Sequence, residues 1–108
     1  MSMPGTSLSN YKKQTFYKNT KKNAIKILRV LKKSHELEEG YMSVSEVARR
    51  TGLHRWTVSR TLDLWMGPVV EIVIPEELEQ VGLKIKLVRL ASPGITEKGM
   101  IKLMSIRF

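Results

Sequence analysis

Two arginines and two short hydroxyl side chains lie close together in the segment HRWTVSR, at residues 54–60. The guanidinium groups of Arg55 and Arg60 can each donate two parallel hydrogen bonds to a planar pair of acceptors, such as O6 and N7 of guanine. The hydroxyls of Thr57 and Ser59 can bond to phosphates or base edges, and the Thr57 methyl can contact a thymine methyl. These groups suit recognition of a nucleic-acid surface rather than cleavage of a bond.

Positive charge is concentrated in the first third of the chain. The 108 residues include 19 Lys and Arg against 10 Asp and Glu, which gives a formal net charge of +9. Residues 1–33 carry nine of these cations and no acid, so the whole surplus lies there. Clustered cations attract polyanions through counterion release, so we expect a polyanionic partner. The alternative is a solvated surface that only improves solubility.

The sequence does not contain the residues that several other kinds of chemistry require. The chain has no cysteine, which excludes disulfides, thiolate metal sites and cysteine nucleophiles. His35 and His54 are too few for a zinc site without carboxylate help, and neither a phosphate loop nor a Gly-x-Ser-x-Gly motif is present. We therefore expect no enzyme activity, no metal and no cofactor. Without an apolar run long enough for a membrane span, and without a secretion signal, we expect a cytoplasmic, nucleoid-associated protein.

The length and patterning predict one domain, residues 19–108, preceded by a basic arm, residues 1–18. The first ten residues are rich in Ser, Gly, Pro, Asn and Thr and are expected to be flexible. In YKKQTFYKN, which follows, Tyr11, Phe16 and Tyr17 alternate with lysines. This segment is either a helix that begins at Ser9 and packs on a partner chain, or an arm that becomes ordered on binding.

A helix is predicted from Thr20 onward, because apolar residues recur there at i, i+3, i+4 and i+7. The opposite side of this helix is basic. The apolar stripe is Ala24, Ile27, Leu28 and Leu31, and the basic residues are Lys22, Lys26, Arg29 and Lys33.

Two shorter helices are predicted next. Ser43 and Glu46 form a capping-box pattern, which predicts a helix from Val44 to about Thr51. Gly52 ends it, because glycine adopts the left-handed conformation at no steric cost. A second helix is expected from about His54 to Met66, and Gly67-Pro68 stops it.

The remainder changes to a strand period. Residues 69–74 and 83–90 are rich in β-branched residues and alternate in polarity, which predicts a two-stranded hairpin. The long connection begins with Pro75, continues with acids and ends with Gly82, so a helical turn is expected in it. Thr96 is expected to cap a last helix from Glu97 to about Ile106, with Ile95 and Met100 spaced as a hydrophobic staple.

The segment VSEVARRTGLHRWTVSRTLDLW resembles the helix-turn-helix of winged-helix transcription regulators. The matching residues are small Ala48, Gly52 in the turn, and Val58 and Leu62 on the buried side of the second helix. The segment ITEKG at residues 95–99 resembles the Leu-Thr-x-Lys-Gly that opens the closing helix in many of these regulators. The resemblance covers residues 20–106. It implies an α+β winged helix-turn-helix fold, with a three-helix core, a two-stranded β-hairpin wing and a C-terminal helix.

The resemblance implies that the second helix enters the major groove of duplex DNA. Val58, Leu62 and Trp65 are spaced to point inward, which leaves the other side of the helix for base contacts. Trp56 is the exception to a polar outer side: it either contacts DNA, or packs under the arm or against a partner subunit. The expected base-reading residues are His54, Arg55, Trp56, Thr57, Ser59 and Arg60.

Phosphate contacts are expected from the ends of the first short helix, from the arm and from the wing strand. The tip of the wing departs from the family, because Glu76, Glu77 and Glu79 would be repelled by phosphates, so we expect it to stay off the DNA. The expected phosphate-contacting residues are Lys12, Lys13, Lys18, Lys21, Lys22, Ser43, Ser45, Arg49, Arg50, Lys84 and Lys86.

The last helix has apolar residues over more than one face, which favours burial on two sides. A twofold homodimer would provide the second cover and would place two recognition helices about 34 Å apart. The alternative is a helix embedded in its own monomer. The expected interface residues are Met100, Ile101, Leu103 and Met104.

The leading expectation is a sequence-specific double-stranded DNA-binding protein, either a transcriptional regulator or a DNA-organising factor of the plasmid-partition type. One alternative is a winged-helix module that binds another protein, through the wing or the arm, and binds DNA weakly or not at all. Another is binding of RNA or single strands through YKKQTFYK, where stacking rings alternate with cations.

Overall fold

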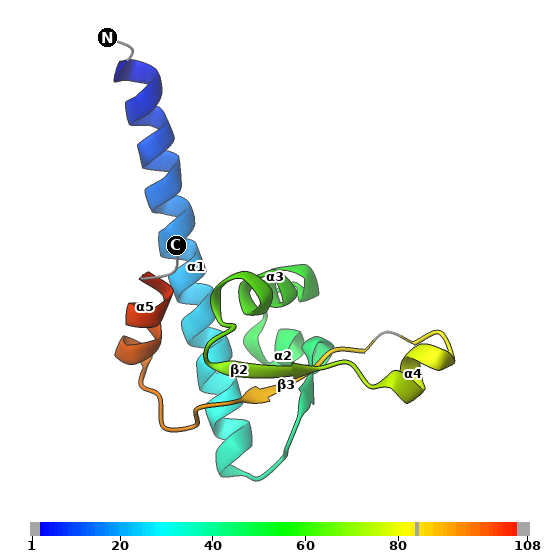
Figure 1. Cartoon of the computed structure of the whole chain (residues 1–108). Helices are drawn as coiled ribbons and strands as arrows, with labels where there is room; N and C mark the ends of the chain where they lie inside the picture. The colour runs from blue at the N-terminus through cyan, green and yellow to red at the C-terminus, as the bar shows by residue number, and fades with distance from the viewer. Residues whose placement is uncertain (1–2, 84, 106–108) are drawn as a thin grey trace.

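The structure, a computed structural model, describes residues 3–83 and 85–105, with side chains from residue 18 onward. In these residues the chain forms an α+β fold of five helices and a three-stranded antiparallel sheet. Helix α1 packs against two further helices, against the sheet and against the last helix, while its N-terminal half extends beyond the rest of the molecule (Figure 1).

Helix α1 spans Met3–Glu36 without interruption. The expected flexible start is therefore wrong from Met3 onward. Residues 11–19 are helical, but the helix begins at Met3 and not at Ser9, and packing on a partner chain stays a prediction. Pro4 and Gly5 lie in the first turn, where a missing amide donor breaks no helical hydrogen bond. No further glycine or proline occurs before Gly40, so nothing in the sequence ends the helix earlier.

Helices α2 (Val44–Thr51) and α3 (Arg55–Trp65) confirm the two short helices. The Glu46 amide donates to the Ser43 hydroxyl at 3.1 Å, as the capping box predicts. The Glu46 carboxylate is used differently, because it accepts from Arg49 and Arg50. Gly52 has a φ of 78°, and its amide donates to the Ala48 carbonyl, so the turn is the predicted left-handed one.

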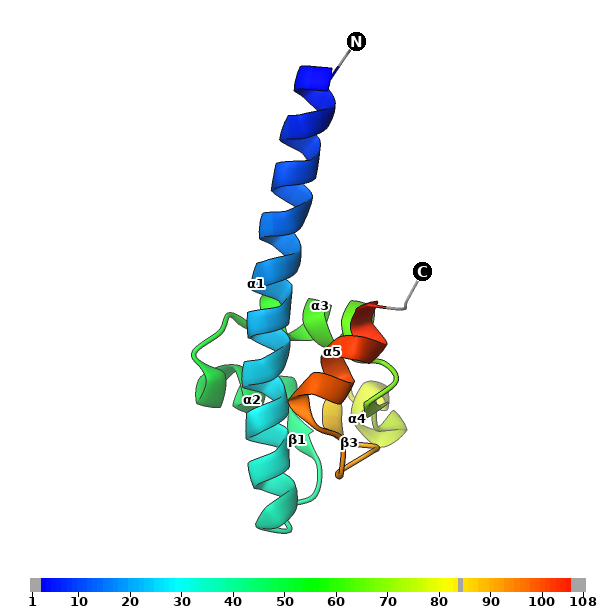
Figure 2. The same ribbon diagram turned by 90° about the vertical axis from the view of Figure 1, so that its left-hand side faces the viewer.

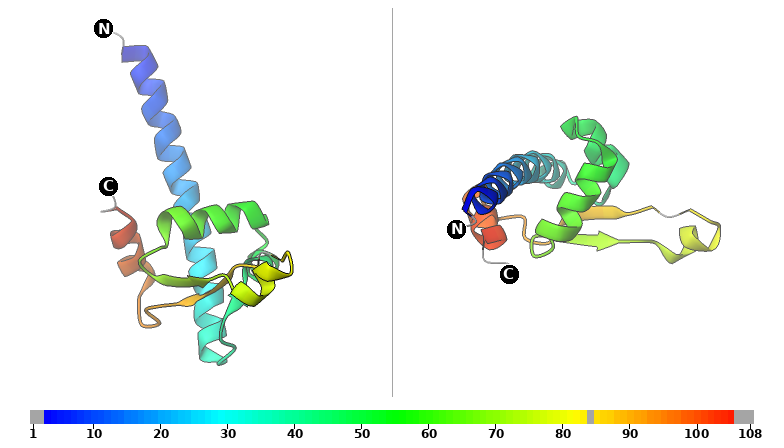
Figure 3. Two further views of the ribbon diagram at one scale, coloured as in Figure 1. Left: turned by 45° about the vertical axis from the view of Figure 1, so that its right-hand side comes forward. Right: turned by 90° about the horizontal axis from the view of Figure 1, so that it is seen from above.

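The sheet has the order β1-β3-β2, with β1 at Met42–Ser43, β2 at Val70–Val73 and β3 at Leu87–Leu90. The β2–β3 hairpin is confirmed, with Val70 opposite Leu90 and Val73 opposite Leu87, although both strands are shorter than expected. The expectation of only two strands is wrong, because β1 pairs with the other edge of β3. The expected helical turn is α4 (Glu76–Gln80), which lies far out along the hairpin (Figure 3).

The last helix, α5 (Glu97–Ser105), lies beside α1 (Figure 2). Its start is as predicted, since the Gly99 amide donates to the Thr96 hydroxyl at 2.9 Å. Ile106, the expected last residue, lies outside the described residues. The pair of Arg29 with Glu97, at 2.8 Å, joins α1 to the first turn of α5.

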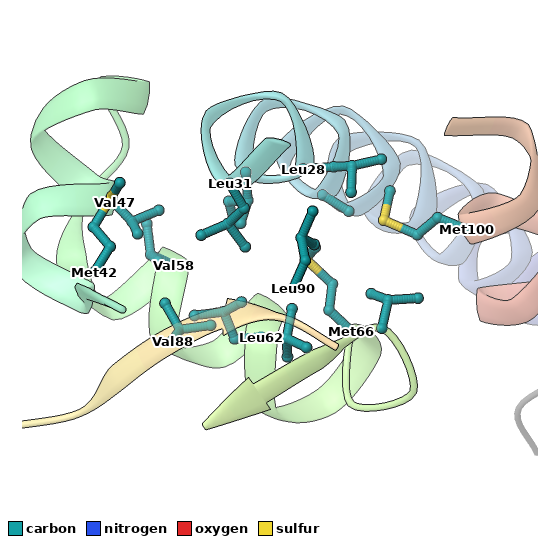
Figure 4. Packing of buried hydrophobic residues seen from close by; sticks show 14 of the residues in the cluster. Leu28, Leu31, Met42, Val47, Val58, Leu62, Met66, Val88, Leu90 and Met100 are labelled. Carbon is teal, nitrogen blue, oxygen red and sulfur yellow. The ribbon is translucent and has the colours of Figure 1, made fainter. Parts of the chain in front are cut away.

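The core lies where α1, α2, α3, α5 and the sheet meet, and its side chains converge from all of them (Figure 4). The predicted α1 stripe is confirmed, since each of its members is at most 2% exposed. The α1 residues of this stripe are Ala24, Ile27, Leu28 and Leu31. None of the helices in the described part of the chain has both the length and the apolar character needed to cross a bilayer.

Candidate nucleic-acid interface

Helix α3 is held to the core along one side and is open along the other. Val58 and Leu62 are fully buried, and Trp65 packs partly buried against the core, as their spacing predicts. Arg55, Trp56 and Arg60 are exposed on the other side. We call the outward residues Arg55, Trp56, Ser59, Arg60 and Asp63 the α3 face.

His54 sets the start of this face. It is the N-cap of α3, and its Nδ1 accepts a hydrogen bond from the Trp56 amide at 3.0 Å. This contact leaves Nε2 as the ring nitrogen that can meet a ligand. His54 therefore has a structural role, as the cap of α3, that its assignment to the base-reading residues did not include.

Trp56 and Arg60 stack on each other. They are one helical turn apart, and the Arg60 guanidinium carbon lies 5.0 Å from the centre of the Trp56 ring system. Trp56 is 63% exposed, so the described side chains of α1 do not cover it. A guanidinium group can stack on an indole ring, and its planar edge has the donor geometry that matches a planar acceptor.

Lys86 is bound to the α3 face. Its Nζ donates to Ser59 Oγ at 2.9 Å and to Asp63 Oδ2 at 2.6 Å. The charge of Lys86 is therefore compensated by Asp63. A contact of Lys86 with the DNA backbone stays a prediction and would compete with this pair. Ser59 is half-buried and accepts from Lys86, so its hydroxyl supports the hairpin as well as facing outward.

Arg49 and Arg50 also have acidic partners. Both donate to the Glu46 carboxylate, and Arg50 additionally pairs with Glu39 at 2.9 Å. Hydrogen bonds from Arg49 and then Arg50 lower the pKa of Glu46 from its ordinary 4.5 to about 2. Both arginines remain exposed, so they can still meet a phosphate, but in competition with Glu46.

A groove of about 570 Å³ separates the α3 face from the hairpin. Val44, Ile74 and Ile85 form its apolar floor. Arg55 lines it, with its Nη1 3.5 Å from the hydroxyl of Ser45 at the start of α2. Arg55 and the Ser45 hydroxyl can donate hydrogen bonds to a phosphate at this groove, whereas the Glu79 carboxylate, which also lines it, repels one.

The remaining residues that were predicted to contact phosphate differ in exposure and in role. Lys18 and Lys22 are exposed on the side of α1 opposite the core stripe, and Lys21 is half-buried with a contact of its own. Lys12 and Lys13 lie in α1, but their side chains are outside the described residues, as is the whole of Lys84. Ser43 serves as the α2 cap. Thr57, which was expected to read bases, is half-buried beside α1.

Two of the four expected dimer-interface residues are wrongly assigned. Met100 and Met104 are 0% and 1% exposed, so they are covered by their own chain and cannot meet a partner. The physical reason is the long α1, which lies alongside α5 and supplies the second cover that a partner subunit was expected to provide. Ile101 and Leu103 are half-buried and keep some exposed surface.

One interaction went unpredicted because its members are distant in sequence. The Tyr41 hydroxyl donates to Glu71, and the Arg89 guanidinium stacks 4.6 Å from the Tyr41 ring while bonding to Glu71. These contacts raise the pKa of Tyr41 and lower that of Glu71, each chiefly through their mutual hydrogen bond. The cluster joins the residue before β1 to β3 and β2, across the sheet.

No protein-family model matches the chain, and no curated protein or solved structure is significantly similar to it.

Proposed function

We propose that the protein is a winged helix-turn-helix protein that binds duplex DNA at specific sequences, without enzyme activity. The observation that carries this proposal is the α3 face: a helix anchored by Val58 and Leu62 presents Arg55 and Arg60 to solvent. A helix of this kind fits the major groove, and arginine is the side chain best suited to guanine there.

The neighbouring surfaces support the same proposal. The groove beside α3 offers Arg55 and the Ser45 hydroxyl, two groups that can donate to a phosphate of the DNA backbone. The cations of α1 add sequence-independent attraction. Bound protein would act by occupation, blocking or recruiting other machinery at a regulatory site or a plasmid-partition site.

The test is selection of duplexes from a random library, followed by electrophoretic shift with random duplex as competitor. We expect one recovered motif, at least 10³-fold preferred over competitor, as is typical of specific binders. An inverted repeat with half-sites about one helical turn apart would support a twofold dimer. Absence of any preferred sequence, at a salt concentration where binding is measurable, would reject the proposal.

A second candidate function is a module that docks on another protein, and one observation favours it. The outer part of the hairpin exposes both glutamates and large apolar side chains, which DNA cannot cover. The pair of substitutions Arg55→Glu and Arg60→Glu separates the candidates. It should abolish duplex binding if α3 reads DNA and leave a protein-binding function intact.

A further inference from the structure

The outer part of the hairpin, residues 73–83, is here called the tip segment. Four of the eight large apolar side chains that are exposed among the described residues belong to it. Val81 and Leu83 are 70% and 51% exposed, and Ile74 and Val73 are 43% and 36% exposed. Such a concentration on one projecting segment marks a contact surface, because a solvated loop has no need of it (Figure 3).

The charge of the tip segment restricts what can cover it. Glu76, Glu77 and Glu79 lie on α4, and residues 69–83 contain no lysine or arginine. Among the described residues, none of these three glutamates takes part in an ion pair. This composition favours an occupant that is cationic and that also offers apolar surface.

The chain itself carries a surface with both properties. Lys18, Lys22 and Lys26 are spaced at i, i+4 and i+8 on α1, and all three are exposed opposite the core stripe. Lysine side chains have apolar stems that can cover Val81 and Leu83 while their ammonium groups reach carboxylates. Within the described part of the chain these three lysines form no ion pair, so their ammonium groups can pair with carboxylates of another molecule.

The two surfaces cannot meet within one molecule. Helix α1 is continuous and held by its buried stripe, and the tip segment projects away from it (Figures 1 and 3). We propose that the tip segment of one copy docks on the Lys18, Lys22 and Lys26 row of α1 in a second copy. Because the contact joins two different surfaces, each copy can both give and receive it, and the copies form a chain or a ring.

Reversing the charge of each surface in a separate variant tests the proposal without DNA. One variant carries Glu76→Lys, Glu77→Lys and Glu79→Lys, and the other carries Lys18→Glu, Lys22→Glu and Lys26→Glu. By sedimentation velocity, each variant alone should self-associate at least tenfold more weakly than the unchanged chain. An equimolar mixture should recover association, because each reversed surface then meets an opposite one. Circular dichroism confirms that both variants keep their helices.

The apolar part of the proposed contact is tested by a second variant with a matched control. The double substitution Val81→Ser and Leu83→Ser should also weaken association. Both side chains are exposed, so the change removes apolar contact surface without altering the core. Leu37→Ser is the control, because Leu37 is 57% exposed but lies outside both surfaces. Association of the unchanged chain should fall as salt is raised.

Three results would overturn the proposal. The unchanged chain could remain monomeric at every concentration and salt, association could survive either charge reversal, or the mixture could fail to recover it. Survival of association would point to a twofold interface through α5. Binding of the tip variant to a short duplex with one site is measured separately, so a failure of the DNA proposal and a failure of this one are distinguishable.

Discussion

At the scale of single residues, Trp56 and Arg60 are the pair with the clearest consequence. Sequence spacing correctly placed Arg55, Trp56 and Arg60 on the exposed side of α3, because the buried positions of a short helix follow from its period. It could not show that Arg60 stacks on Trp56, since the same spacing is compatible with other rotamers. Nor could it show that Lys86 pairs with Asp63, which is distant in sequence.

Arg60→Ala is expected to weaken binding to the selected duplex by about 1–3 kcal/mol and to relax the preference for one guanine. Trp56→Ala should produce part of the same loss by removing the ring that supports the guanidinium, and Trp56→Phe should retain most of the affinity. Fluorescence anisotropy with the selected duplex and with single-base variants measures both effects. Lys98→Ala, on exposed α5 surface, is the control. An unchanged preference in Arg60→Ala would contradict a reading role for Arg60.

The lowered pKa of Glu46 predicts how the stability of the fold depends on pH. Its pKa in the fold, about 2, lies below the ordinary 4.5, so its charged form stabilises the folded state above pH 4.5. That contribution is lost as the pH falls from about 4.5 through about 2. Carboxyl chemical shifts should show Glu46 titrating near the lower value, and Arg49→Ala with Arg50→Ala should return it toward the ordinary one. Titration near 4.5 in the unchanged protein would show that the pairs do not form.

At the scale of elements, the short helices were predictable because their signals are local. Ser43, Gly52, Pro68 and Thr96 mark boundaries by their own backbone and side-chain chemistry. Strand β1 was not predictable, because two residues have no period and their pairing depends on a distant strand. The start of α1 was missed because its first residues have a composition typical of loops.

Gly52 and Gly94 form a matched pair for the turn between α2 and α3. Gly52 has a φ of 78°, whereas Gly94 does not have a positive φ, and an added Cβ would meet nothing within 4 Å at either position. Gly52→Ala should therefore lower the free energy of unfolding by about 1–2 kcal/mol through strain alone. Gly94→Ala should change it by much less. Urea unfolding measures the difference, and equal effects would mean that the turn relaxes without cost.

At the scale of the whole molecule, the core begins at about residue 20 of α1, well after the helix itself begins. Removal of residues 1–17 is therefore expected to leave the urea midpoint nearly unchanged. It also removes Lys12 and Lys13, so duplex binding should weaken and its salt dependence should become shallower. Complete loss of binding would instead favour recognition of single strands or RNA by the YKKQTFYK segment.

The projecting part of α1 fixes the distance between the start of this helix and the core. At about 1.5 Å per residue, the 17 residues from Met3 to Asn19 hold Met3 about 25 Å from the first buried turn. Whatever meets that end is positioned both in separation and in rotational phase, because each residue turns the helix by about 100°. A single inserted residue would rotate every group beyond it to a different side, whereas seven would restore the phase and lengthen the rod by two turns.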